Sequence, residues 1–286
     1  MVLKKIIQQH FPHATLIDSS RPKGGISADI TIVEILVNKQ RQKVIIRQTA
    51  TAENEFKLLT SLQATQIRSP KPLILDTSCN LVPTPYLILE HISGQPEYRF
   101  KEPARAGEMI GAELAAIHSA QLSAASHSFL PLHTVDLPTA SDDLAERPLH
   151  DILESFWPLP SPKQPVLLHG DFWPGNLLWK DSTLTGVIDW EDARFGNPLQ
   201  DLAISRFDTL FILGQSAFEG LTRTYFELNQ FDYAQLARWD LYASLRAMPA
   251  IAQWAAGWPS LGRPDLTETA INQSLSWFIQ QAMAKI

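Results

Sequence analysis

The chain has 286 residues, which is enough for one large domain or two lobes, and 45% of them are apolar. The formal net charge is −6. Nucleic acids and anionic membranes favour clustered Lys and Arg, so neither is an expected partner. Cys79 is the only cysteine, which excludes an intrachain disulfide and favours a reducing, cytoplasmic location. No run of about 20 apolar residues predicts a membrane span.

The first third of the chain is predicted to mix strands with a helix. Residues 29–37 are rich in Ile and Val with partial alternation, as expected for a half-buried strand. Phe56, Leu59 and Leu62 fall on one stripe of a helix over 52–62. The predicted elements are strands over 29–37, 43–47 and 85–90, a polar hairpin turn over 38–41, and a helix over 52–62.

From residue 105 onwards the pattern becomes mainly helical. Ile110, Leu114 and Ile117 follow the spacing of one helix face. Met248 is followed by Pro249, and proline should kink or end a helix at that point. Helices are predicted over 105–118, 142–157, 201–213, 216–228, 233–254 and 266–283, with proline-rich loops around the second of them.

One motif places three oxygen-bearing side chains at a characteristic spacing. The sequence His-Gly-Asp-Phe-Trp-Pro-Gly-Asn spans 169–176, and Val-Ile-Asp follows at 187–189. Asn176 lies 5 residues after Asp171, and Asp189 lies 13 residues after Asn176. Kinase catalytic loops have the same Asp-to-Asn spacing, and a further Asp binds the metal ion. The motif therefore predicts phosphoryl transfer.

Gly170 stands where the kinase loop H-R-D has its Arg. In protein kinases this Arg commonly meets the phosphate of the activation loop. Its absence favours a constitutive enzyme that acts on small molecules. The segment from Asp189 to Asp201 is also too short for a peptide-docking loop, which argues against a protein kinase.

The order of the elements predicts an α+β fold with a protein-kinase-like, bilobal arrangement. Residues 1–92 would form a small, β-rich N-lobe that binds nucleotide. Residues 93–286 would form a larger, mainly helical C-lobe with the catalytic and acceptor-binding groups. A linker is expected near 91–96, and the cleft between the lobes is the expected ligand site.

The chain resembles the aminoglycoside phosphotransferase family, which comprises small-molecule kinases with a protein-kinase-like fold and is related to choline, homoserine and fructosamine kinases. The resemblance implies ATP (without ruling out GTP), Mg²⁺ and a small-molecule hydroxyl acceptor: an aminoglycoside-like antibiotic, an amino alcohol or a sugar-like metabolite. It covers most of the chain and lies in residues 23–27, 44–47, 55–59, 86–90, 114–118, 169–176, 188–191 and 196–203.

The resemblance assigns roles to the motif residues. Asp171 would accept or orient the proton of the acceptor hydroxyl. Asn176 and Asp189 would supply the hard oxygen ligands that Mg²⁺ prefers. The structural alternative for all three is a cap or turn position. His169 is expected to be a hydrogen-bonded structural residue, and Asp201 is expected to cap the next helix or to hold the catalytic loop.

Two N-lobe segments are expected to contact the nucleotide through the backbone. Gly24, Gly25 and Ser27 fit a loop that closes over phosphates, although an ordinary hairpin turn is the alternative. The segment that includes Glu90 and Ile92 would present backbone groups to the adenine.

Arg47 stands where a kinase has its phosphate-pairing Lys. A guanidinium can bind two phosphate oxygens in its fixed fork. Glu55 would hold Arg47 by an ion pair, and Glu53 is the competing choice. An exposed strand Arg and a solvated helix Glu are the structural alternative.

The acceptor site is the least defined. Trp254 and Trp258 fall in the helical part, and tryptophan faces attract quaternary ammonium groups and stack on sugars. Glu191 is a third candidate for acceptor binding. No carboxylate side chain occurs over 276–286, which argues against a polycationic aminoglycoside. A monomer or a homodimer is expected.

A nucleotide-binding pseudokinase that serves as a scaffold is the alternative function. Pseudokinases usually lose one of the three motif residues, whereas Asp171, Asn176 and Asp189 are all present. The kinase interpretation is therefore preferred.

Overall fold

The computed structural model describes residues 2–21, 29–123, 126, 128–139, 146–162 and 164–286. The chain divides into two compact units. Unit 1 spans residues 1–94, 122–130 and 185–191, and unit 2 spans residues 95–121, 131–184 and 192–286.

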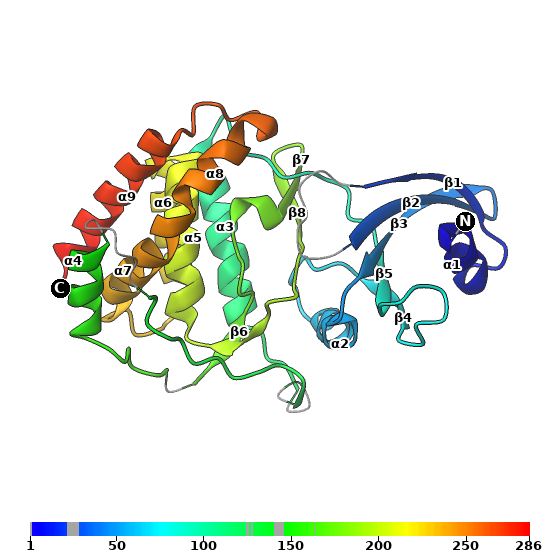
Figure 1. Ribbon diagram of the computed structural model, residues 1–286, viewed down its shortest axis with the longest axis horizontal. Helices are drawn as coiled ribbons and strands as arrows, with labels where there is room; N and C mark the ends of the chain where they lie inside the picture. Colours follow the sequence, from blue (N-terminus) through cyan, green and yellow to red (C-terminus); the bar gives the residue numbers. More distant parts are fainter. Residues whose placement is uncertain (1, 22–28, 124–125, 127, 140–145, 163) are drawn as a thin grey trace. The chain divides into compact units, whose positions relative to one another are not determined.

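Unit 1 is built on a five-stranded antiparallel sheet in the order β1-β2-β3-β5-β4 (Figure 1). Asn38 and Lys39 form the two-residue turn between β2 and β3, with φ angles of 49° and 67°. This left-handed geometry matches the twist of a hairpin. The strands are β1 (Thr15–Ser20), β2 (Asp29–Val37), β3 (Gln40–Gln48), β4 (Pro72–Asp76) and β5 (Tyr86–Glu90).

Helices pack on the two faces of this sheet. Successive residues of a strand point to opposite faces, so Ile46 and Arg47 of β3 point in opposite directions. Arg47 points toward α2 (Ala52–Leu62), where Glu55 pairs with it. The face of Ile46 is covered by α1 (Val2–His10), and the apolar core there contains Ile6, Ile7, Val33, Ile35, Val44, Ile46, Tyr86 and Ile88.

Residues 185–191 are held within unit 1 by contacts with Arg68, Ile92 and Ser93. Val187 N donates to Arg68 O at 2.7 Å, and Thr185 Oγ1 donates to Ser93 O at 2.9 Å. A Cβ at Gly186 would lie 2.7 Å from Cδ1 of Ile92, so glycine allows this close approach. These contacts fix the segment that carries Asp189.

Unit 2 is mainly helical and surrounds α5 (Pro198–Leu213), which is buried along almost its whole length and packs on α6, α7 and α9 (Figure 1). Helix α3 packs closely on α6. Glycine at 107 allows this approach, because a Cβ there would lie 1.9 Å from the backbone oxygen of Ala217. The other helices are α3 (Pro103–His118), α4 (Arg147–Glu154), α6 (Gln215–Leu228), α7 (Leu236–Ala247), α8 (Ile251–Gly257) and α9 (Glu268–Met283).

Short strands flank the motif at 169–176. Strand β6 (Val166–Leu168) is apolar and pairs antiparallel with β9 (Arg194–Gly196). A single 3-10 turn over Pro174–Asn176 then leads into a hairpin of β7 (Leu177–Lys180) and β8 (Thr183–Val187). The motif is therefore a loop anchored by β-structure at both ends.

The predicted element boundaries agree with the structure in some places and not in others. The strand over 29–37 and the helix over 52–62 are confirmed residue for residue. A helix was predicted over 233–254 with a break at Pro249. The break is confirmed, since a 3-10 turn over Met248–Ala250 separates α7 from α8. The helix predicted over 142–157 is wrong in length, since α4 spans Arg147–Glu154 and residues 140–145 lie outside the described part.

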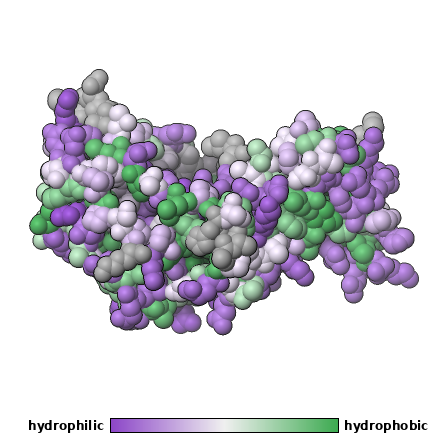
Figure 2. Space-filling model, turned by 90° about the horizontal axis from the view of Figure 1, so that it is seen from below, coloured by the Kyte–Doolittle hydropathy of each residue, from purple (hydrophilic) through white to green (hydrophobic). Residues whose placement is uncertain are grey.

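Hydrophilic residues cover much of the face shown in Figure 2, with apolar groups scattered among them. Within the described ranges, each helix is too short or too polar to cross a bilayer.

Candidate active site

The loop after β6 requires glycine at position 170. Gly170 has a φ of +87°, and a Cβ there would lie 2.2 Å from the backbone oxygen of Asp192. A side chain would therefore be strained by the backbone and would also collide with a neighbouring segment. This explains why Arg is absent here, independently of any regulatory loop.

Asp201, which lies on α5, holds the backbone of the loop that follows β6. Its Oδ2 accepts hydrogen bonds from His169 N at 2.7 Å and Gly170 N at 3.2 Å. Burial raises the pKa of Asp201, but His118 and the backbone donor of Gly170 outweigh burial and hold the pKa below its usual value. Asp201 is therefore an ionised, buried anchor for the loop.

The prediction that Asp201 could cap its helix is wrong. Helix α5 begins at Pro198, and Asn197 is the cap, with its side chain accepting a hydrogen bond from Leu199 N at 3.0 Å. Proline suits the first helical position because its missing N–H would have no partner there. Asp201 thus lies inside the first turn, and its carboxylate is available to the loop.

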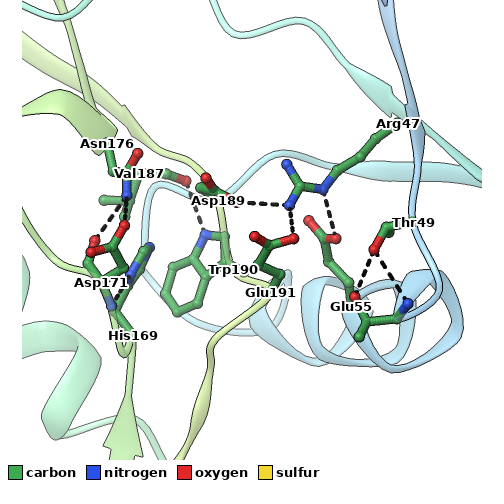
Figure 3. A network of polar contacts seen from close by, with 11 residues as sticks. Arg47, Thr49, Glu55, His169, Asp171, Asn176, Val187, Asp189, Trp190 and Glu191 are labelled. Atoms are coloured by element: carbon green, nitrogen blue, oxygen red, sulfur yellow. Dashed lines mark hydrogen bonds and ion pairs between the residues drawn. The ribbon is translucent and has the colours of Figure 1, made fainter. Parts of the chain in front are cut away.

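Asn176 binds Asp171 in two ways (Figure 3). Its Nδ2 donates to Asp171 O and to Asp171 Oδ2, both at 2.9 Å. Asn176 is buried, whereas Asp171 is partly exposed. Because the amide nitrogen is used inside the loop, the carbonyl oxygen of Asn176 is the atom directed away from Asp171. That orientation suits a hard cation.

His169 is buried and structural in its contacts, as expected. Its Nδ1 accepts from Asp171 N at 3.3 Å, and its ring meets Phe172 edge-on at 5.8 Å between centroids. The side chain therefore supports the backbone of the loop.

In unit 1, three carboxylates converge on Arg47 (Figure 3). Arg47 Nε donates to Glu55 Oε2 at 3.0 Å, and Nη2 donates to Asp189 Oδ1 at 2.7 Å and to Glu191 Oε2 at 2.6 Å. Glu53 instead pairs with Lys57 on the exposed side of α2. Of the two glutamates considered from the sequence, the structure joins Glu55 to Arg47.

This cluster carries excess negative charge. One guanidinium faces three carboxylates, so formally one positive and three negative charges leave a net charge of −2. Burial raises the pKa of Glu55 to about 7; Arg47 opposes that rise, and Asp189 adds to it. The Asp189 side chain is 29% exposed. A partly exposed carboxylate in a cluster with more carboxylates than cations among the described residues fits a divalent cation.

The backbone at Asp189 is also unusual, with a φ of 68°. Non-glycine residues rarely adopt this left-handed conformation, and Asp is among those that tolerate it. Trp190 follows it, is 1% exposed, and donates from Nε1 to Val187 O at 3.0 Å. The turn that presents Asp189 is therefore held by a buried indole.

The remaining expected nucleotide contacts are placed only in part. Gly24, Gly25 and Ser27 lie outside the described residues. Glu90 ends β5, and its backbone N donates to Lys71 O at 2.9 Å, so that donor is already used. Ile92 packs against Gly186. A role for Glu90 and Ile92 in adenine binding stays a prediction.

The three residues suggested for acceptor binding have different surroundings. Glu191 pairs with Arg47 in unit 1. Trp254 stacks on Phe211 with ring centroids 5.9 Å apart, and Trp258 is buried at 4% exposure. Their role in acceptor binding stays a prediction.

Two polar residues of α5 were missed from the sequence. Ser205 donates from Oγ to Phe172 O at 2.6 Å, and Asp208 is 9% exposed. Together with Asp201 they follow the i, i+4, i+7 spacing of one helix face. The spacing of these three residues is present in the sequence. It gave no clear signal, because most other residues of α5 are apolar and the helix has no distinct polar face.

Comparisons with known proteins place this geometry in a family. The model of the phosphotransferase enzyme family (APH) matches residues 35–239. "Acyl-CoA dehydrogenase family member 10" of Mus musculus is 25% identical over 192 residues, which cover 60% of this chain and 18% of that protein. The chain spans less than a third of the length of the curated relatives that it matches.

Solved structures share the fold at low sequence identity. Macrolide 2'-phosphotransferase MphH from Brachybacterium faecium has a TM-score of 0.64 at 17% identity, covering 96% of each chain. Spectinomycin phosphotransferase APH(9)-Ia, solved with ADP and spectinomycin, has a TM-score of 0.69 at 13% identity, covering 99% of this chain and 97% of that one. The α+β, protein-kinase-like fold expected from the sequence is confirmed. Because the family model matches well over half of its length, the chain belongs to the phosphotransferase enzyme family (APH).

Proposed function

We propose that this member of the family is an ATP- and Mg²⁺-dependent kinase that phosphorylates a hydroxyl group of a small molecule. The observation that carries the proposal is the double hydrogen bond from Asn176 to Asp171, at 2.9 Å for each contact. It holds the Asp171 carboxylate and leaves the amide oxygen of Asn176 for another partner, which supports the roles proposed for the two residues in phosphoryl transfer.

Asp171 is the group that positions the acceptor. Its carboxylate accepts a hydrogen bond from the acceptor hydroxyl, and the hydroxyl oxygen then forms a bond to the γ-phosphorus as the bond from that phosphorus to the β–γ bridging oxygen breaks. ADP leaves, and the hydroxyl proton passes to Asp171. Asp201 and Ser205 hold the backbone on either side of this carboxylate.

Arg47 of unit 1 binds a phosphate group of the nucleotide. Its guanidinium is held by buried Glu55 and offers its outer nitrogens to anions. A nucleotide phosphate that bound Nη2 would replace Asp189 and Glu191 there and release both carboxylates. This exchange links nucleotide binding to the availability of Asp189 as a ligand.

Asn176 and Asp189 are the residues that would hold Mg²⁺. The carbonyl oxygen of Asn176 and the carboxylate of Asp189 are hard donors, and the net charge of −2 around Arg47 fits a divalent ion. When bound, Mg²⁺ neutralises charge on the phosphate oxygens.

The acceptors of known relatives guide the choice of substrates for a test. The structures with the same fold include one enzyme named for macrolides and one named for spectinomycin. Since one fold serves such different acceptors, the assay should sample aminoglycosides, macrolides, amino alcohols and sugar-like alcohols.

The test is ADP release from Mg²⁺-ATP with these acceptors, comparing wild type with Asp171→Asn. Asp151→Asn, an exposed carboxylate on α4, is the control for the removal of a charge. We expect wild type and Asp151→Asn to release ADP with one acceptor class and Asp171→Asn to fall roughly 100-fold or more. Equal turnover by Asp171→Asn would refute the proposal. Nucleotide binding without turnover by wild type would favour a pseudokinase.

A further inference from the structure

A line of buried polar side chains leads from the catalytic loop (169–176) into the packing of α3, α5 and α6. It begins at Asp201 of α5, whose Oδ2 accepts hydrogen bonds from the backbone N–H groups of His169 and Gly170. His118, the last residue of α3, lies beside it, with Nε2 3.7 Å from the same oxygen. Tyr225 of α6 follows, with its hydroxyl oxygen 2.5 Å from His118 Nδ1. Asp201 and His118 are 2% exposed and Tyr225 is 0% exposed, so bulk water screens these contacts little.

The neighbours of Tyr225 determine which way its hydroxyl proton points. Ser119 Oγ donates to Asn229 Oδ1 at 2.7 Å, and the amide nitrogen of Asn229 donates to Ala115 O at 3.4 Å. Burial raises the pKa of Tyr225, and a hydrogen bond from the Asn229 side chain opposes the rise. The phenol oxygen therefore accepts from Asn229, which leaves its proton for His118 Nδ1.

The two nitrogens of His118 have different partners, and these assign its proton. A neutral imidazole carries a proton on one nitrogen and a lone pair on the other. Nδ1 faces the hydroxyl of Tyr225, which can donate to a lone pair. Nε2 faces the carboxylate of Asp201, which attracts an N–H and repels a lone pair. Both partners thus favour a proton on Nε2, and burial disfavours the charged ring that has two protons.

The orientation of the His118 ring matters for Asp201. Nε2 has no hydrogen-bond partner among the residues that the structure describes, and its distance of 3.7 Å from Asp201 is longer than a hydrogen bond. The contact is therefore an electrostatic one between an N–H dipole and a carboxylate. With the N–H end toward Asp201 the ring stabilises the anion, whereas with the lone-pair end it would destabilise the anion. The bond from Tyr225 to Nδ1 keeps the favourable end in place.

We propose that His118 and Tyr225 are positioning residues for the catalytic loop: Tyr225 orients the His118 ring, and the Nε2–H of that ring stabilises the carboxylate of Asp201, which holds the loop. Their effect on turnover rests on the proposed function, to which they add two residues outside the motif. Both act through Asp201 and not on the acceptor or the nucleotide. Without the phenol, the ring loses the bond that fixes its orientation, and the loop that carries Asp171 is held less firmly.

The first test is spectroscopic and needs no acceptor. In protein with ¹⁵N-labelled histidine, a ring nitrogen without a proton resonates far downfield of one with a proton, and the signals of His118 are those lost in His118→Gln. We expect a protonated Nε2 and an unprotonated Nδ1 in wild type. Tyr225→Phe should move the Nδ1 signal further downfield, because that nitrogen no longer accepts a hydrogen bond. A protonated Nδ1 in wild type, or an unchanged signal in Tyr225→Phe, overturns the proposal.

Tyr233→Phe is the matched control for Tyr225→Phe. The Tyr233 hydroxyl donates to Asn229 O at 2.8 Å, and its ring meets that of Tyr225 at 6.3 Å between centroids. The control therefore removes one tyrosine hydroxyl from the same cluster and leaves the bond to His118 in place. Its Nδ1 signal should be that of wild type.

Hydrogen exchange measures how firmly the loop is held, also without an acceptor. Mass spectrometry follows the amides of a peptide over 166–173, which includes the two N–H groups that Asp201 binds. These amides should exchange faster in Tyr225→Phe than in wild type or Tyr233→Phe. Urea unfolding of the same variants separates local opening of the loop from global unfolding. Equal local exchange in Tyr225→Phe and Tyr233→Phe would contradict the proposal.

The kinetic test uses the acceptor found in the ADP-release assay. Tyr225→Phe should lower kcat roughly fivefold and leave the KM for ATP unchanged, because one buried hydrogen bond is lost and the nucleotide contacts are kept. His118→Gln should retain more of the wild-type kcat than His118→Leu, since the amide nitrogen of glutamine can take the place of Nε2. Adding Tyr225→Phe to His118→Gln should lower kcat no further. Equal losses in His118→Gln and His118→Leu would rule out a role for the Nε2–H.

The two proposals fail in different ways. Equal turnover by wild type and Asp171→Asn would refute the kinase function, and the NMR and exchange results would still decide whether His118 and Tyr225 support the loop. Loss of turnover in Asp171→Asn, together with the same kcat and the same loop exchange in Tyr225→Phe and Tyr233→Phe, would refute only the role of His118 and Tyr225.

Discussion

Asn176 donates two hydrogen bonds to Asp171, one to its backbone oxygen and one to its carboxylate, each 2.9 Å long. One amide nitrogen thus fixes both the loop backbone and the side chain that would meet the acceptor. This relationship makes the two residues one functional unit, and their substitutions should not be additive.

Asn176→Ala should therefore lower kcat by roughly 100-fold or more, because Asp171 loses its orientation and the metal ion loses a ligand. The measurement is steady-state ADP release at saturating ATP and acceptor. The double variant with Asp171→Asn should be about as slow as the slower single variant. Full additivity of the two losses would contradict a shared role.

Gly170→Ala should destabilise unit 2. A positive φ costs a non-glycine residue about 1–2 kcal/mol, and the added Cβ would lie 2.2 Å from Asp192 O. Urea unfolding followed by circular dichroism measures the loss. Gly257→Ala is the matched control, since nothing lies within 4 Å of a Cβ there. If the two variants unfolded at the same urea concentration, the requirement for glycine at 170 would be wrong.

Arg47→Ala should destabilise unit 1 by about 3–5 kcal/mol, because it leaves Glu55 buried without its Arg47 counterion and removes the guanidinium that pairs with Asp189 and Glu191. It should also raise the KM for ATP roughly tenfold or more. Arg41→Ala, on the same strand but exposed, should change the free energy of unfolding by less than about 1 kcal/mol. An unchanged KM in Arg47→Ala would exclude Arg47 as a phosphate contact.

Asp208→Asn should raise the free energy of unfolding of the protein without ligands, and the increase should be larger at higher pH. The pKa of Asp208 is raised from 3.8 to about 7, so the folded state binds its proton more tightly than the unfolded state. Wild type therefore loses stability as pH rises from about 4 to about 7, and the loss is complete above the folded pKa. Thermal unfolding at pH 4, 6 and 8 should show that the difference in Tm between Asp208→Asn and wild type increases with pH and then levels off. A gap independent of pH would argue against a buried, ionised Asp208.

The parts of the fold that the sequence predicted well are those with a periodic apolar pattern. Strand β2 alternates, and α2 has one apolar stripe, so both boundaries are confirmed. Strand β1 was not predicted because nearly all of its residues are exposed, which leaves no alternation to detect. The three-residue strand β9 is too short for any period.

The motif residues could be named from their spacing, and two supports, Asp201 for the loop and Glu55 for Arg47, were expected as well. The φ of Gly170 depends on packing that the local sequence does not encode. Asn197 before Pro198 is a local signal for the start of a helix, and the prediction of a helix from residue 201 missed it. Asp208 read as one more polar residue of a helix, because burial and missing partners are properties of the folded chain.

Trp190 opposes a rearrangement of the segment that follows Asp189. Turning out the segment that follows Asp189 would expose a side chain that is now 1% exposed and break its hydrogen bond to Val187 O. Those losses amount to about 3–4 kcal/mol, which corresponds to roughly one molecule in several hundred. An inactive form of that kind would be rare unless a bound partner stabilised it by several kcal/mol, so the segment after Asp189 does not turn out on its own.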